Sequence, residues 1–245
     1  MIKSVFFVCF FLLFSIDVAA QANGLIEDIE TSELLNNLAP ELKTAGMLTL
    51  MSLVPVMLIA LTAFTRIVIV LSMLRHALGL QQTPPNVVII TLSLFLTFFT
   101  MSPVFEKADE NALRPYIKSE ISLSQAIENG AEPFKAFMLQ QTREEDFLAV
   151  LDMAGESHAP DTMDDVTFKH LIPAFLLSEL TTAFKIAFVI FIPFLLIDLV
   201  VASVLMSLGM IMVPPISIAL PIKVMLFVLI DGWSLVTGSL VASFA

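Results

Sequence analysis

The segment from Ile192 to Pro215 (IPFLLIDLVVASVLMSLGMIMVPP) constrains most strongly what this chain can fold into. It is long enough to cross a bilayer, which takes about 20 apolar residues. Within it lie one acid, Asp198, a glycine, Gly209, and a final Pro214-Pro215 pair. An ionisable residue inside an apolar run indicates a functional site, and irregular backbone there is tolerated only where protein or water surrounds it. We therefore expect this segment to face protein or a pore.

The composition extends this expectation to the whole chain. Of the 245 residues, 58% are hydrophobic and only 14% are charged, whereas soluble proteins have about 25% charged residues. The sequence therefore predicts an all-α integral membrane protein. A net charge of −11 with no cluster of Lys and Arg argues against nucleic-acid binding, because phosphate contacts need clustered basic side chains. The single cysteine, Cys9, excludes an internal disulfide or a zinc–thiolate site.

The order of apolar and polar segments predicts two helical hairpins, with about four hydrophobic helices of which some are broken. They flank a small extracytoplasmic helical domain. The predicted boundaries are a signal peptide at 1–22, a polar extracytoplasmic lead at 23–46, the first hairpin at 47–106, the acidic helical domain at 107–170 and the second hairpin, with a Met-rich turn, at 171–245. An uncleaved first transmembrane helix is the alternative to the signal peptide. The basic pair Arg75-His76 places the first turn, and with it the Met-rich turn, on the cytoplasmic side.

The acidic domain contains short amphipathic patterns. Phe134, Phe137 and Met138 share one helix face after Pro133, a residue that suits the first position of a helix. We expect these three side chains to pack against other subunits outside the membrane. Gly155 is expected to end the next helix.

Six charged side chains lie in or beside the apolar blocks: Arg66, Glu179, Lys185, Asp198, Lys223 and Asp231. Arg66 has two interpretations: its long side chain reaches towards the helix end, or it pairs with an acid inside an assembly. Glu179 and Lys185 are six residues apart and lie on different helix faces, so each needs its own partner. Neighbouring subunits are candidates for those partners.

Lys223 and Asp231 are eight residues apart in the last apolar block. This spacing places them on roughly one face of a helix. We expect them to meet an adjacent helix that carries Asp198 or Glu179.

The methionines near Gly209 form the other candidate site. Met206 and Met210 lie four residues apart on one helix face, and Met212 follows in the turn. A single methionine is usually a gap-filler in an apolar core. A cluster beside a glycine and a proline pair instead indicates a flexible pore gasket, which closes the pore and deforms around a passing polypeptide.

Enzymatic motifs are missing from the sequence. It has no Gly-rich phosphate loop, no His-Glu-x-x-His and no Gly-x-Ser-x-Gly. The three histidines, His76, His158 and His170, lie in unrelated contexts, and His158 is interpreted as an ordinary loop residue. No enzyme activity, cofactor or metal is predicted.

Five stretches, in order along the chain, resemble one protein family. They are Thr65 to Asn86 (TRIVIVLSMLRHALGLQQTPPN), Pro133 to Met138 (PFKAFM), Glu179 to Phe188 (ELTTAFKIAF), Ile192 to Pro215 and Lys223 to Trp233 (KVMLFVLIDGW). The sequence is similar there to the FliP family, the pore-forming export-gate proteins of the bacterial flagellar type III secretion system, and to their injectisome counterparts.

The resemblance implies a helical oligomer of five copies, joined by four Q proteins and one R protein and by the A, B and O components of the export apparatus. It places the chain in the inner membrane at the flagellar basal body, with a periplasm-facing domain. It implies unfolded rod, hook and filament proteins as substrates, with energy from a separate ATPase and the proton-motive force. It further implies that the charges are satisfied between subunits and that Met210 and Met212, with Ile211 between them, form the gasket.

Two other functions remain open from the residues alone. Broken helices with intramembrane charges are also typical of small-solute secondary transporters, although the two hairpins show no evident internal repeat. A membrane assembly scaffold is the remaining alternative.

Overall fold

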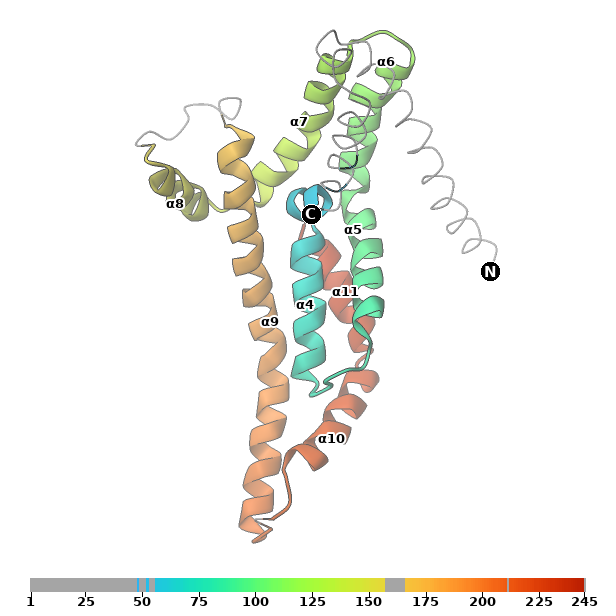
Figure 1. The fold of residues 1–245 in the computed structure, drawn as a ribbon. Helices are drawn as coiled ribbons and strands as arrows, with labels where there is room; N and C mark the ends of the chain where they lie inside the picture. The colour runs from blue at the N-terminus through green and yellow to red at the C-terminus, as the bar shows by residue number, and fades with distance from the viewer. Residues whose placement is uncertain (1–47, 49–51, 53–55, 157–165, 211, 245) are drawn as a thin grey trace, which may run out of the picture. The chain divides into compact units, whose positions relative to one another are not determined.

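The computed structural model describes residues 48, 52, 56–156, 166–210 and 212–244 (Figure 1). The predicted signal peptide, the polar lead and the start of the first hairpin lie outside the described residues. The chain divides into two compact units, Met1–Pro55 and Val56–Ala245, and the following description concerns the second. Every regular element among its described residues is a helix, as predicted.

The first hairpin consists of α4 (Phe64–Ala77) and α5 (Asn86–Ala108), which pack against each other. Arg75 closes the turn between them, because its Nη1 donates to Asn86 Oδ1 at 2.6 Å and to the carbonyl oxygen of Pro84 at 3.2 Å. Gly79 adopts φ 79° where α4 ends, a backbone conformation that glycine tolerates best.

The polar middle of the chain is helical as well. α5 continues into the π-helical turn η1 (Asp109–Leu113) and the short α6 (Arg114–Ile117), followed by α7 (Leu123–Gln141) and α8 (Glu144–Ala154). α7 packs on α5 and on the following long helix, α9 (Phe168–Ser207), which also contacts α8.

Two local predictions in this region have opposite outcomes. The expected helix start at Pro133 is wrong, because a capping box between Ser122 and Gln125 begins α7 earlier and Pro133 lies inside the helix. The expected helix end at Gly155 is confirmed: this glycine has φ 74° after the last residue of α8.

α9 is a continuous helix of 40 residues, about 60 Å long at 1.5 Å per residue. The prediction of a broken helix in this segment is wrong, and Pro173 and Pro193 both lie inside α9. A proline removes one backbone hydrogen bond, but ending the helix in apolar surroundings would leave several more unsatisfied. The helix therefore continues through both residues.

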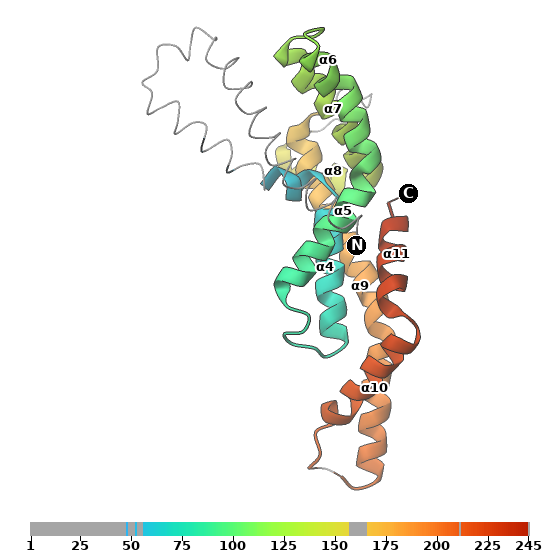
Figure 2. The same cartoon turned by 90° about the vertical axis from the view of Figure 1, so that its right-hand side faces the viewer.

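The last apolar block forms α10 (Ile216–Leu229) and α11 (Gly232–Ala242), with an angle of 64° between them. Figure 2 shows the change of direction. Asp231 lies at the bend with φ 49°. The prediction that Lys223 and Asp231 share one helix face is therefore wrong, since the helix that carries Lys223 ends before Asp231.

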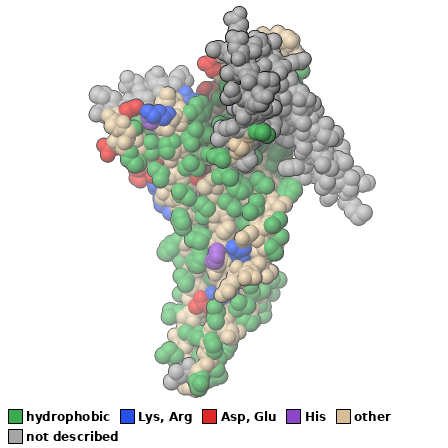
Figure 3. Space-filling view, viewed as in Figure 1, with side chains coloured by type: hydrophobic (Ala, Val, Ile, Leu, Met, Phe, Trp, Pro, Cys, Tyr) green, Lys and Arg blue, Asp and Glu red, His purple; other side chains and the backbone are tan. Residues whose placement is uncertain are grey.

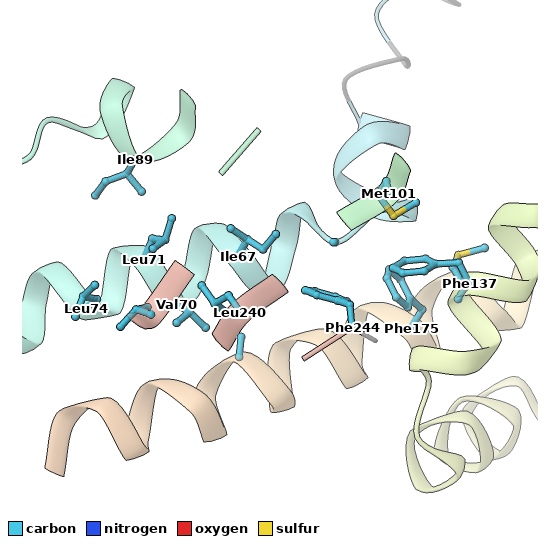
Figure 4. Packing of buried hydrophobic residues seen from close by; sticks show 14 of the residues in the cluster. Ile67, Val70, Leu71, Leu74, Ile89, Met101, Phe137, Phe175, Leu240 and Phe244 are labelled. Carbon is cyan, nitrogen blue, oxygen red and sulfur yellow. The ribbon is translucent and has the colours of Figure 1, made fainter. Parts of the chain in front are cut away.

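The hydrophobic core surrounds α4. Ile67, Val70, Leu71 and Leu74 of α4 are fully buried and join one cluster with side chains of α5, α7, α9 and α11 (Figure 4). In the described part of the chain, two helical segments are long and apolar enough to cross a membrane, Asn86–Ile117 and Phe168–Ser207. Together, α10 and α11 make a third if the bent pair is one span.

Candidate functional site

A buried ion pair joins the two hairpins. Arg66 of α4 is 2% exposed and Glu179 of α9 is fully buried. Arg66 Nε donates to Glu179 Oε2 at 2.9 Å, and Nη2 donates to Oε1 of the same carboxylate. This bidentate geometry is the strongest form of an arginine–carboxylate contact. Of the two interpretations of Arg66, pairing with an acid is the one seen in the structure, and the acid belongs to the same chain.

The remaining donors of Arg66 reach two other parts of the fold. Nη2 also donates to Gln141 Oε1 of α7 at 3.0 Å. Nη1 donates to the carbonyl oxygen of Ser243 at 3.2 Å and to the Ser243 hydroxyl at 3.3 Å. Each nitrogen of the buried guanidinium thus has an acceptor within the chain, as a buried charge requires.

A second pair joins α10 to α9. Lys223 Nζ donates to Asp198 Oδ2 at 2.6 Å and to the carbonyl oxygen of Ala77, at the end of α4, at 3.3 Å. Of the two helix positions predicted as possible partners of Lys223, Asp198 and Glu179, Asp198 is the partner. Lys185 and Asp231 are exposed, and among the described residues neither has an ion-pair partner.

Four of the six charges therefore have partners in their own chain: Arg66, Glu179, Asp198 and Lys223. The family resemblance led us to expect these partners between subunits. Spacing along a helix shows which residues share a face, but it does not show which helices pack together. Residues far apart in the sequence meet here because the second hairpin folds back on the first.

A third polar cluster was not predicted from the sequence. Arg143, at the start of α8, donates to Asp146 from Nε and Nη2, both at 2.8 Å. Ser178 of α9 donates its hydroxyl to Asp146 Oδ2 at 2.6 Å and accepts the Arg143 backbone N–H at 2.9 Å. The hydrogen bond from Arg143, followed by that from Ser178, lowers the pKa of Asp146. The three-residue spacing indicates the Arg143–Asp146 contact, but nothing in the sequence indicates Ser178.

The predicted methionine turn connects α9 to α10 at one end of the second hairpin (Figure 1). Gly209 has φ 73°, and the backbone N–H of Met210 bonds the carbonyl oxygen of Leu205 at 3.0 Å. This is the pattern by which a glycine ends a helix. The prediction that Met206 and Met210 share one helix face is wrong, because α9 ends at Ser207 and Met210 lies beyond the helix. Met206 is exposed in the last turn of α9, Met210 is exposed after Gly209, and Met212 is 96% exposed. Ile211 lies outside the described residues.

The aromatic face of α7 has a different position from the one expected. Phe137 and Met138 are buried in the core of their own chain, where Phe137 contacts the rings of Phe175 and Phe244. Phe134 is partly buried against Phe105, with ring centroids 5.9 Å apart. These side chains pack inside the chain, and their role at a subunit interface has no support from this geometry.

In the described ranges, no group of His, Cys, Asp or Glu could hold a metal ion. The buried polar clusters instead hold helices against one another.

The sequence was compared with known protein families. The model of the FliP family matches residues 47–240. The chain belongs to the FliP family. The match includes α4 to α10, the Arg66–Glu179 pair and the methionine turn.

Relatives named flagellar biosynthetic proteins are similar over most of the chain. A flagellar biosynthetic protein of Pectobacterium carotovorum is 54% identical over 82% of this chain and 78% of its own length. One from Bacillus subtilis is 49% identical over 85% of this chain and 94% of its own length. One from Agrobacterium fabrum is 41% identical over 98% of both chains.

Proposed function

We propose that this chain is a structural pore subunit of the flagellar type III protein export gate, which passes unfolded rod, hook and filament proteins across the bacterial inner membrane. Membership in the FliP family and relatives named flagellar biosynthetic proteins support a role in building the flagellum. The pore role depends on the geometry of the methionine turn.

The exposed methionine turn is the observation that carries the proposal. Met206 is exposed in the last turn of α9, and Met210 and Met212 are exposed in the connection between Gly209 and the Pro214-Pro215 pair. Such side chains adapt to differently shaped neighbours. A ring of these turns from several copies closes a pore to small solutes and yields to an unfolded polypeptide.

The length of α9 supports assembly into an oligomer. At about 60 Å it is twice the roughly 30 Å hydrocarbon thickness of a bilayer, and large apolar side chains are exposed along it from Leu177 to Met206. Lipid cannot cover both halves. We infer that neighbouring copies, about five in number, and the Q and R proteins of the gate cover the remainder.

The other parts of the proposal follow from the family resemblance. The acidic segment 107–170 is the periplasm-facing domain, the A, B and O components are further partners, and the subunit itself is not an enzyme. Energy comes from a separate ATPase and the proton-motive force. The transporter alternative is less favoured, because the buried charges that suggested a solute site, Arg66, Glu179 and Lys223, have partners in the chain.

The test is the double variant Met210→Ala, Met212→Ala in cells that carry the complete export apparatus. We expect the closed gate to leak, seen as an increase in membrane ion conductance, because alanine leaves gaps where the thioethers met. Met225→Ala is the matched control, since Met225 is 59% exposed on α10 but lies outside the turn. Conductance equal to that of the unmodified chain would count against the gasket.

A further inference from the structure

The attachment of α11 depends on few side chains. Only Gly232, Val236 and Leu240 of this helix are buried, whereas Leu235 on the same helix is more than half exposed. α11 follows a sharp bend, so α10 does not hold it in line. Contacts at the far end of α11 therefore have a large influence on whether the helix stays in place.

The residues that follow α11 turn into the core. Phe244 is 7% exposed, and its ring lies under the Arg66 guanidinium, with Cζ 3.9 Å from the ring centroid. The same ring stacks on Phe137 of α7 at 6.2 Å. A cation over an aromatic face is attracted to it, and more strongly where water is excluded.

The backbone carbonyl groups of Ser243 and Phe244 also accept hydrogen bonds. Gln141 Nε2 donates to the carbonyl oxygen of Phe244 at 3.3 Å, and Arg66 Nη1 donates to the carbonyl oxygen of Ser243 at 3.2 Å. Side chains from α4 and α7 thus hold the backbone after α11.

The contacts depend on one another. Glu179 occupies Arg66 Nε and shares Nη2 with Gln141, whereas Ser243 supplies every acceptor of Nη1 found among the described residues. Without Ser243, a buried donor lacks an acceptor, which is unfavourable. Conversely, the guanidinium lies over Phe244 because Glu179 orients it. These contacts all form only when α4, α7, α9 and the end of α11 are packed together.

We propose that Ser243 and Phe244 form a latch, which locks α11 onto the Arg66–Glu179 pair and so fixes the second hairpin against the first. The latch holds the end of α11, while the Lys223–Asp198 pair holds α10 against α9. This role concerns contacts within one chain and does not depend on the pore function.

The experiment is hydrogen–deuterium exchange of the full chain in a mild detergent, read separately for residues 232–242 of α11 and for α4. In Phe244→Leu, which keeps an apolar side chain but removes the ring, we expect exchange in α11 to rise about 5- to 30-fold, the range for a lost desolvated cation–π contact. Exchange in α4 is expected to rise much less, because its packing against α5 and α9 is unchanged.

Phe175→Leu is the matched control: it removes a fully buried ring of the same aromatic cluster, whereas the cation–π contact of Arg66 is with Phe244. We expect no selective rise in α11 there. Gln141→Leu, which removes a hydrogen bond to each side of the latch, should raise α11 exchange in the same direction, and it decides the question if Phe244→Leu does not fold. Unchanged α11 exchange in the variants, or an equal rise in the control, would overturn the latch.

Discussion

At the scale of single residues, the charges inside the apolar segments are structural. A buried charge is tolerated when it is paired and its remaining donors are satisfied. Arg66 meets this condition through one carboxylate and neutral acceptors on two other elements. These side chains therefore fix which helices pack together, and they are not free to bind a solute.

We expect Glu179→Ala to lower the free energy of unfolding by roughly 3–5 kcal/mol, because it leaves Arg66 buried without its counter-charge. Thermal unfolding of the purified chain in detergent measures the loss. Lys185→Ala is the control: Lys185 is exposed on the same helix and has no ion-pair partner among the described residues, so its effect should stay within about 0.5 kcal/mol. Equal effects of the two substitutions would contradict the assignment.

At the scale of elements, the bend between α10 and α11 depends on a close contact. Gly232 lies against the buried ring of Phe227, so a Cβ built on Gly232 would be 2.2 Å from Phe227 Cε2. The absence of a side chain at this position lets α11 start directly against α10. The bend in turn brings the end of α11 to Arg66.

We expect Gly232→Ala to destabilise the fold by about 1–3 kcal/mol, the usual cost of overpacking a core. Gly238→Ala, on the same helix, should be neutral or stabilising by up to about 1 kcal/mol, because its added Cβ meets no atom within 4 Å. Chemical denaturation of both variants gives the comparison. The packing account is wrong if Gly232→Ala is no less stable than Gly238→Ala.

The elements also show what the sequence could and could not predict. The helix end at Gly155 was recognisable, because a side chain at its positive φ would be strained. The end of α9 before Gly209 was not, since the four-residue spacing of Met206 and Met210 indicated one continuous helix face. Prolines were misleading: a capping box starts α7 well before Pro133, and the apolar α9 continues through Pro173 and Pro193. Helical spacing placed charges on faces but could not identify neighbouring helices, so the Arg66–Glu179 pair and the role of Ser178 came only from the structure.

At the scale of the whole molecule, charges are paired inside while apolar side chains dominate the outside. Figure 3 shows hydrophobic side chains over most of the visible face, and exposed large apolar residues occur along α5, α9 and α10. With α9 about twice as long as a bilayer is thick, lipid accounts for only part of this surface. We propose that other protein chains cover the rest.

Native mass spectrometry tests the central claim, a subunit of a multi-component export gate, most directly. The detergent-extracted chain is measured alone and after co-expression with the Q and R proteins of the gate. The proposed function predicts a discrete homo-oligomer that gains the mass of these partners, because the exposed apolar surface of α9 needs protein neighbours. A monomer in both preparations would contradict it.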